Sequence, residues 1–255
     1  MRRFFAFGCS YTRYHYPTWA DIIGAGFDEF YNYGQAGVGN RYIFSAVAEA
    51  NIVHKFTSND LIMIEWSAVE REEEFFDSRW NTQLHRGKKQ REGYTTENKL
   101  LETLTYIIIV KALLTAMGIE HRFFPMIDFA DADCQFPDML NFYKKAVESL
   151  MPGVVNSIEA VRPVRISNRI IHDGHHLPWE HYDYVQRYLP EYLPAISNLR
   201  EEMKSVYEKT IDIALNDSDQ EIALSNAMWP VKIPIGTIKP VLFTSSKTFP
   251  TPFTK

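Results

Sequence analysis

The chain has 255 residues, of which 45% are hydrophobic and 23% are charged, a composition typical of a globular protein with one substantial core. It excludes a disordered chain, a coiled coil and a small disulfide-stapled scaffold. The net charge of -5 argues against a nucleic-acid partner, because proteins that bind phosphate backbones are usually basic. Two cysteines, Cys9 and Cys134, are too few for a disulfide framework.

The first residues have the basic-then-apolar order of a signal peptide, with Arg2 and Arg3 followed by the apolar residues 4–7. That apolar run is shorter than the roughly 7–15 residues of a signal core. The longest apolar stretch, residues 106–119, is interrupted by Lys111, whereas a bilayer span needs about 20 residues with few or no charges. We therefore expect a soluble protein that is cytoplasmic at synthesis and has no membrane partner.

Short β-rich runs alternate with longer helical ones, a pattern typical of a parallel sheet covered by helices on both faces. Residues 61–66 are nearly all apolar, which predicts a central strand buried on both faces. Gly118 lies where a helix C-cap glycine is expected. Further strands are expected at residues 3–7, 29–31 and 119–126, with a weak one at 166–171. Helices are expected at residues 18–23, 42–54, 96–117, 137–150 and 178–189.

Two segments depart from this alternation. Residues 70–99 carry dense charge, and their length predicts either a lid or substrate-contacting insertion or a solvated helical hairpin. Beyond Glu221 there is no acidic residue, and five of the 13 prolines fall there. We therefore expect an α/β domain over residues 1–200, a helix over 201–221 and an extended basic tail over 222–255. This tail is a candidate for docking onto an identical copy or an assembly partner.

The first candidate for chemistry is Gly8-Cys9-Ser10, directly after the first strand. Open α/β sheets place reactive groups at the carboxyl ends of their strands, and a glycine permits the tight turn required there. Small-residue turns after strands are also common without catalysis. Cys9, beside a buried strand end, is better explained as a packed small hydrophobic residue than as a nucleophile.

The second candidate is the His-Asp-Gly-His-His run at residues 172–176. A serine hydroxyl becomes a good nucleophile when an imidazole takes its proton and a carboxylate orients that imidazole. Asp173 and His176 suit these roles, although His175 is also available and the sequence does not decide between the two histidines. A surface or helix-capping run is one alternative. Another is a metal site, for which the imidazole donors are His172, His175, His176 and His181.

The content and order of these blocks resemble those of the SGNH (GDSL-type) hydrolases over residues 3–190. Gly8-Cys9-Ser10 resembles the nucleophile block, with Cys9 where the namesake pattern has aspartate. Residues 32–37, Asn-x-Gly-x-x-Gly, resemble the block with the oxyanion-hole glycine, and residues 173–176 resemble the last Asp-x-x-His block. The resemblance implies a three-layer, flavodoxin-like α/β fold and no cofactor. It also implies a triad of Ser10, His176 and Asp173, with oxyanion donors at the N–H groups of Ser10 and Gly37.

The third block of the family departs from its usual pattern here. After the central strand the family has Gly-x-Asn-Asp, whereas this chain reads Glu65-Trp66-Ser67-Ala68. A missing oxyanion donor can cost about 2.7–4 kcal/mol of barrier. Asn40, three residues after Gly37, is the first substitute that we consider, although helix capping suits it equally well. The other substitutes are Ser67 and Arg71.

The resemblance implies a serine esterase that removes small acyl groups, above all acetyl, from a carbohydrate or similar ester. A second hypothesis is a catalytically weak or inactive SGNH-fold module that binds within a larger assembly. Gly-Cys-Ser variants with a Trp-Ser third block look similar to proteins encoded by tailed phages, which makes a virion-associated role part of that hypothesis. A third hypothesis is metal-dependent hydrolysis by the histidine cluster.

Overall fold

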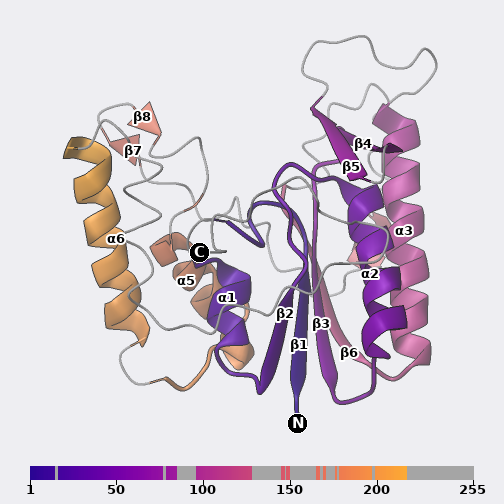
Figure 1. The fold of residues 1–255 in the computed structure, drawn as a ribbon, viewed down its shortest axis with the longest axis horizontal. Helices are drawn as coiled ribbons and strands as arrows, with labels where there is room; N and C mark the ends of the chain where they lie inside the picture. The colour runs from indigo at the N-terminus through magenta and orange to yellow at the C-terminus, as the bar shows by residue number, and fades with distance from the viewer. Residues whose placement is uncertain are drawn as a thin grey trace.

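The structure is a computed structural model, and it describes residues 1–14, 17–76, 79–84, 96–127, 145–146, 148–149, 165–166, 169–170, 176, 178–196 and 199–216. Four parallel strands form its central sheet in the order β2-β1-β3-β6 (Figure 1). They are β1 (Arg3–Phe7), β2 (Glu29–Asn32), β3 (Asp60–Trp66) and β6 (Glu120–Pro125). All seven residues of β3 are buried between two neighbouring strands, which confirms the predicted central strand.

Helices cover both faces of the sheet, as the alternation predicts (Figure 1). On one side lie α1 (Trp19–Gly24) and α5 (Pro178–Tyr188), which contact each other, and α6 (Leu199–Asn216) packs against α5 further out. On the other side α2 (Asn40–His54) packs against α3 (Thr96–Ala116). The protein is therefore a three-layer α/β fold.

The strand order determines which edge of the sheet is suited to binding. Counted along the chain, the four parallel strands follow the 2-1-3-4 order of flavodoxin-like sheets. The chain leaves β1 towards β2 on one side and later returns to form β3 on the other. Ligands in such folds bind at the carboxyl ends of the strands where the connections diverge. In this protein that point lies between the segments that follow β1 and β3.

Aromatic pairs fix the register of β1 against β2. Phe4 and Phe30 are partners across the two strands and stack with ring centroids 5.2 Å apart, and Phe5 and Tyr31 repeat the arrangement at 4.7 Å on the opposite face. Such cross-strand pairs stabilise a sheet beyond the area that they bury. Because a slip by one residue would turn each ring to the wrong face, the level at which β1 ends is well defined.

The charged segment after β3 forms a β-hairpin over its described part. β4 (Arg71–Phe76) pairs antiparallel with β5 (Arg79–Leu84) beside the upper ends of α2 and α3 (Figure 1). The expected helical hairpin is therefore wrong for these residues. Phe75 and Trp80 are Cα partners across the hairpin, and aromatic residues of this kind favour strands. Residues 77–78 and 85–95 lie outside the described part.

The weak strand expected at residues 166–171 does not join the central sheet. Instead β7 (Arg165–Ile166) and β8 (Arg169–Ile170) form a separate antiparallel pair. The run contains Asn168 and Arg169, residue types that are poorly suited to a strand buried on both faces.

Two other expected segments are described in part. Residues 145–146 and 148–149 are helical within the helix expected at 137–150, and the remainder of that segment lies outside the described residues. The helix expected at 201–221 is α6, which spans Leu199–Asn216. The tail at 222–255 lies outside the described residues. None of the described helices is long and apolar enough to cross a membrane.

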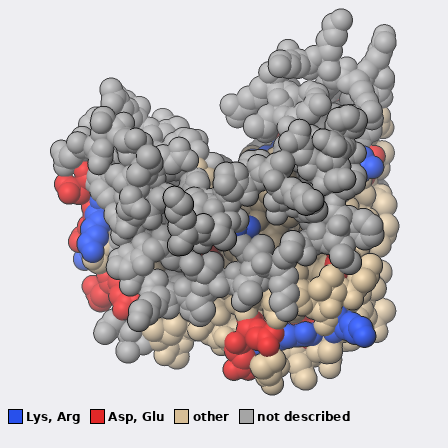
Figure 2. Space-filling model, in the orientation of Figure 1, with Lys and Arg blue, Asp and Glu red and all other residues tan. Residues whose placement is uncertain are grey.

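Figure 2 shows acidic and basic groups along the lower edge, where the strands begin, and over α6, whereas much of the visible surface over α2 and α3 is neither acidic nor basic. On α3 the side chains of Leu101, Ile108 and Ile109 are about half exposed.

Candidate active site

A tight turn carries Ser10 directly after β1. The backbone N–H groups of Thr12 and Arg13 both donate to the carbonyl of Cys9, at 3.1 and 3.2 Å, which closes the turn around Ser10. Ser10 itself is only 4% exposed. A Cβ at Gly8 would overlap the hydroxyl of Thr12 and lie 3.0 Å from Cβ of Glu65. Glycine is therefore required at position 8 because Thr12 approaches the backbone so closely.

The loop after β2 is hydrogen-bonded to the Ser10 turn. The N–H of Gln35 donates to the carbonyl of Gly8 at 3.1 Å, and the side-chain amide of Asn32 donates to the carbonyl of Thr12 at 2.9 Å. Asn32 also accepts the N–H of Gly34 at 2.9 Å. Gly37 follows with a φ of 79°, a conformation that favours glycine. Residues 32–37 thus lie against the turn that carries Ser10.

His176 lies beside the Ser10 turn, directly before α5. Its ring is fully buried and meets the ring of Tyr11 edge to face, with centroids 5.2 Å apart. Because Tyr11 is the chain neighbour of Ser10, this contact joins the first and last blocks that the sequence singles out. Asp173 and His175 lie outside the described residues, so the choice between the two histidines and the role of Asp173 stay predictions.

Asn40 uses its side-chain amide to tie three elements together. Its Nδ2 donates to the carbonyl of Ser67 at 2.9 Å and to the hydroxyl of Thr103 at 3.0 Å, while its Oδ1 accepts the N–H of Ser67 at 2.7 Å. It is the first residue of α2, and Gly39 is the N-cap. Both amide hydrogens are engaged, so an oxyanion role would require Asn40 to exchange one of these bonds for the substrate. That role stays a prediction.

Ser67 and Arg71, the two other substitutes for the missing asparagine, differ in how many hydrogen-bond donors their side chains carry. The Ser67 hydroxyl donates to the carbonyl of Val38 at 2.9 Å, which engages its single hydrogen. Arg71 donates one Nη1 hydrogen to the same carbonyl at 3.1 Å, and a guanidinium carries five N–H groups. Arg71 also lowers the pKa of the Cys9 thiol, which places its charge near the Ser10 turn.

Cys9 is packed as the sequence suggests. It is fully buried, and its Sγ lies 3.1 Å from Sδ of Met126. Burial, reinforced by the charge of Glu65, raises the pKa of the thiol to about 11 despite the opposing effect of Arg71. A thiol with this pKa stays protonated at neutral pH and is a poor nucleophile.

Glu65 is the polar residue of the site that sequence reasoning missed. It is fully buried on β3, where its Oε2 accepts hydrogen bonds from the hydroxyl of Thr12 and, at 3.5 Å, from Nε1 of Trp19. Burial raises its pKa to about 7, although both hydrogen bonds and the charge of Arg71 act in the opposite direction. The signal was present in the sequence as the one carboxylate within the otherwise apolar run of residues 61–66.

A second buried carboxyl, Asp21, lies in the first turn of α1. It forms a capping box with Thr18, accepting the Thr18 N–H at 2.9 Å. Burial raises its pKa to about 6, against the effect of these hydrogen bonds and of Arg13. Thr18 in turn donates its hydroxyl to the carbonyl of Thr12 at 2.6 Å, so α1 is also anchored to the Ser10 turn.

The metal hypothesis depends partly on residues beyond the described part. His176 and His181 lie near each other, with ring centroids 6.1 Å apart. Among the residues that the structure describes, no three His, Cys, Asp or Glu side chains are grouped so that they could hold a metal ion. His172 and His175, which that hypothesis also needs, lie outside these residues.

No protein-family model matches the chain, and no curated protein matches it. Among solved structures, the chain is similar to a GDSL-like lipase from Bacteroides thetaiotaomicron VPI-5482, with a TM-score of 0.45 and 15% sequence identity. The match covers 75% of this chain and 87% of that one.

Proposed function

We propose that the protein is a serine esterase of the SGNH type that removes small acyl groups, above all acetyl, from a carbohydrate or similar ester. The proposal rests on one observation: the contact of His176 with Tyr11, the neighbour of Ser10, at the carboxyl end of β1. The resemblance of the sequence blocks to SGNH hydrolases supports the reaction type. The strand order supports the location, because flavodoxin-like sheets bind ligands at this edge.

The reaction would begin with Ser10. Its Oγ attacks the ester carbonyl carbon while His176 takes the hydroxyl proton as general base. The resulting imidazolium then gives that proton to the leaving alkoxide, which departs as an alcohol and leaves Ser10 acylated. In the second half of the reaction, water attacks the acyl carbon while His176 takes a proton from it. The imidazolium then returns that proton to Ser10 Oγ as the carboxylic acid leaves. In this scheme Asp173 orients the imidazole and stabilises its positive charge.

The negative charge on the carbonyl oxygen needs donors in both steps. The backbone N–H groups of Ser10 and Gly37 are the first two candidates, since the loop that holds Gly37 is hydrogen-bonded to the Ser10 turn. Asn40 remains the third candidate, and Arg71 is the alternative with additional N–H groups.

Turnover of p-nitrophenyl acetate and labelling by a fluorophosphonate test the proposal together. We expect hydrolysis by the wild-type protein and one adduct on Ser10. Ser10→Ala should abolish both, and His176→Ala should reduce both by at least about 10³-fold. Hydrolysis that is retained in Ser10→Ala and lost on chelation would instead support the metal hypothesis. Absence of turnover and of Ser10 labelling in the wild-type protein would defeat the esterase proposal.

One observation favours the alternative of a catalytically weak or inactive binding module. The amide hydrogens of Asn40 are engaged by Ser67 and Thr103, and the third block lacks its usual asparagine. A site with one oxyanion donor fewer is expected to turn over ester about 10²–10³-fold more slowly than a site with all its donors. Under this alternative Ser10 would still react with a phosphonate, whereas ester turnover would be slower than that of an enzyme with all its oxyanion donors by about this factor.

A further inference from the structure

Glu65 is a buried carboxyl that the proposed reaction does not use. It lies near the carboxyl end of the central strand, and its Cβ lies 3.0 Å from where a side chain at Gly8 would begin. Its Oε2 accepts the hydroxyl of Thr12 and Nε1 of Trp19, whereas Oε1 has no hydrogen-bond partner among the described residues. A buried carboxyl with an unsatisfied oxygen lowers stability, so packing alone does not explain this residue.

Thr12 links Glu65 to the nucleophile. Its N–H closes the turn around Ser10 by donating to the carbonyl of Cys9 at 3.1 Å. Its carbonyl accepts hydrogen bonds from Asn32 at 2.9 Å and from Thr18 at 2.6 Å. Its hydroxyl donates to Glu65. The backbone of Thr12 is thus held by the last residue of β2 and by the N-cap residue of α1, and its side chain is held by the central strand.

The Glu65–Thr12 bond also accounts for the neighbouring glycine. The Thr12 hydroxyl occupies the space where a Cβ at Gly8 would lie, and it occupies that space while bonded to Glu65. The nucleophile turn is therefore folded down onto β3 at this point. Among the described residues, Thr12 bonds to Asn32, Thr18 and Glu65 beyond the turn itself, and the bond to Glu65 is the one of these that reaches β3.

We propose that Glu65 is a positioning residue for Ser10, acting through the hydroxyl of Thr12. The inference rests on the proposed function, because it assigns Glu65 the task of setting where the Ser10 hydroxyl and N–H lie relative to substrate and base. A displacement of about 1 Å at a nucleophile can lower the reaction rate by about 10²-fold. Loss of one hydrogen bond that positions this turn should therefore slow the reaction of Ser10.

A double variant separates positioning from stability. Replacing both partners by apolar residues of similar size can be nearly neutral or stabilising. Here Nε1 of Trp19 loses a long bond of 3.5 Å, while the buried carboxyl with its unsatisfied Oε1 is removed as well. We expect Thr12→Val/Glu65→Leu to unfold at or above the wild-type Tm and yet to react with a fluorophosphonate at Ser10 about 10–100-fold more slowly. A residue with a merely structural role would not lower reactivity while stability is retained.

Single variants test the route through Thr12. Thr12→Ser keeps the hydroxyl and should label within about threefold of the wild-type rate, whereas Thr12→Val should be as slow as the double variant. Asp60→Asn is the matched control, since Asp60 is a buried carboxylate at the other end of β3. It should label at the wild-type rate. Wild-type labelling by the double variant, or equal rates for Thr12→Val and Thr12→Ser, would overturn the inference.

Hydrogen–deuterium exchange over residues 8–13 decides the inference without catalysis. The amides of Thr12 and Arg13 both donate to Cys9, so they report whether the turn is held. We expect faster exchange in the double variant than in wild-type protein and in Asp60→Asn. If the wild-type protein proves unreactive, the esterase proposal fails while this comparison still measures the hold of Glu65 on the turn. Equal exchange rates in all three proteins would contradict the inference that Glu65 stabilises this turn.

Discussion

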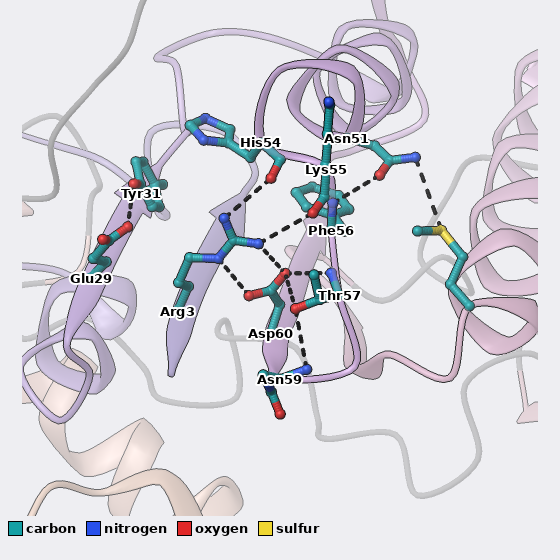
Figure 3. A network of polar contacts seen from close by, with 11 residues as sticks. Arg3, Glu29, Tyr31, Asn51, His54, Lys55, Phe56, Thr57, Asn59 and Asp60 are labelled. Atoms are coloured by element: carbon teal, nitrogen blue, oxygen red, sulfur yellow. Dashed lines mark hydrogen bonds and ion pairs between the residues drawn. The ribbon is translucent and has the colours of Figure 1, made fainter. Parts of the chain in front are cut away.

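β3 carries a buried carboxyl group at each end, and the two have opposite surroundings. At the amino end, Asp60 accepts Nε and Nη2 of Arg3 at 2.7 and 2.6 Å and the N–H of Thr57 at 2.7 Å (Figure 3). Arg3 also donates to the carbonyls of His54 and Lys55. Towards the carboxyl end, both hydrogen bonds of Glu65 fall on Oε2, and its Oε1 has no hydrogen-bond partner among the described residues.

This difference separates stabilising from functional polar groups. Where donors saturate a buried carboxylate, as around Asp60, the charges support the fold. Where a carboxyl is buried without enough donors, as at Glu65, its pKa rises and it costs stability. The second arrangement lies directly under the turn that carries Ser10. We infer that the amino-terminal edge of the sheet stabilises the protein and that the carboxyl-terminal edge carries its chemistry.

The largest effect is expected from breaking the amino-terminal network. Asp60→Ala leaves the guanidinium of Arg3 without its carboxylate partner, and removing one member of a buried pair costs about 3–5 kcal/mol. Denaturant unfolding should show this loss. Fluorophosphonate labelling of Ser10, measured where the variant is still folded, should stay within about twofold of wild type. Slower labelling of the folded variant would mean that the two edges are not separate in function.

The reverse pattern is expected from Gly8→Ala. The added methyl overlaps the hydroxyl of Thr12, so the Ser10 turn must shift. We expect labelling to slow by about 10²-fold and the free energy of unfolding to fall by about 1–3 kcal/mol. Gly26→Ala is the matched exchange at an exposed glycine before β2, and it should leave labelling unchanged. A normal rate in Gly8→Ala would contradict the tight turn.

Glu65 should also make stability depend on pH. Its folded pKa of about 7 lies above its usual 4.5, so the folded state binds this proton more tightly than the unfolded state. Relative to Glu65→Gln, the wild-type protein should therefore lose stability as pH rises from about 4.5 to 7, by about 3 kcal/mol, and no further above that range. Parallel unfolding titrations of the two proteins would measure this. A difference in the free energy of unfolding that does not change with pH would contradict the raised pKa of Glu65.

The smallest effect is expected away from both edges. Asp183 and Arg187 form an ion pair on the outside of α5, one helical turn apart, with the arginine side chain 59% exposed. Exposed pairs of this kind contribute about 0.3–0.5 kcal/mol. Asp183→Asn should change the free energy of unfolding by no more than this amount and leave Ser10 labelling unaltered. A loss above about 1 kcal/mol would show that this pair stabilises the protein more than its exposure predicts.

The alternation of apolar runs predicted the three-layer fold well. The continuous apolar run of β3 identified the central strand because a strand covered on both faces needs no polar alternation. Charge density misled the interpretation of residues 71–84, where aromatic residues favour a hairpin over a helix. A run as short as residues 166–171 contains too little periodicity to reveal which sheet it joins.

The candidate site was only partly predictable. The position of Ser10 follows from local sequence, because a strand that ends in glycine places the next residues at the edge of the sheet. The contact between Tyr11 and His176 and the bond between Thr12 and Glu65 join distant parts of the chain. Such contacts depend on how the layers pack, which periodicity alone does not specify. The engagement of Asn40 by Ser67 and Thr103 was hidden for the same reason.

Fluorophosphonate labelling, read by intact mass and peptide mapping, tests the central claim most directly. The account predicts one adduct on Ser10 in wild-type protein and in Asp60→Asn, much slower labelling in His176→Ala, and none in Ser10→Ala. An unlabelled Ser10 in folded wild-type protein, or labelling at the same rate without His176, would contradict the claim that the carboxyl-terminal edge of the sheet carries the chemistry.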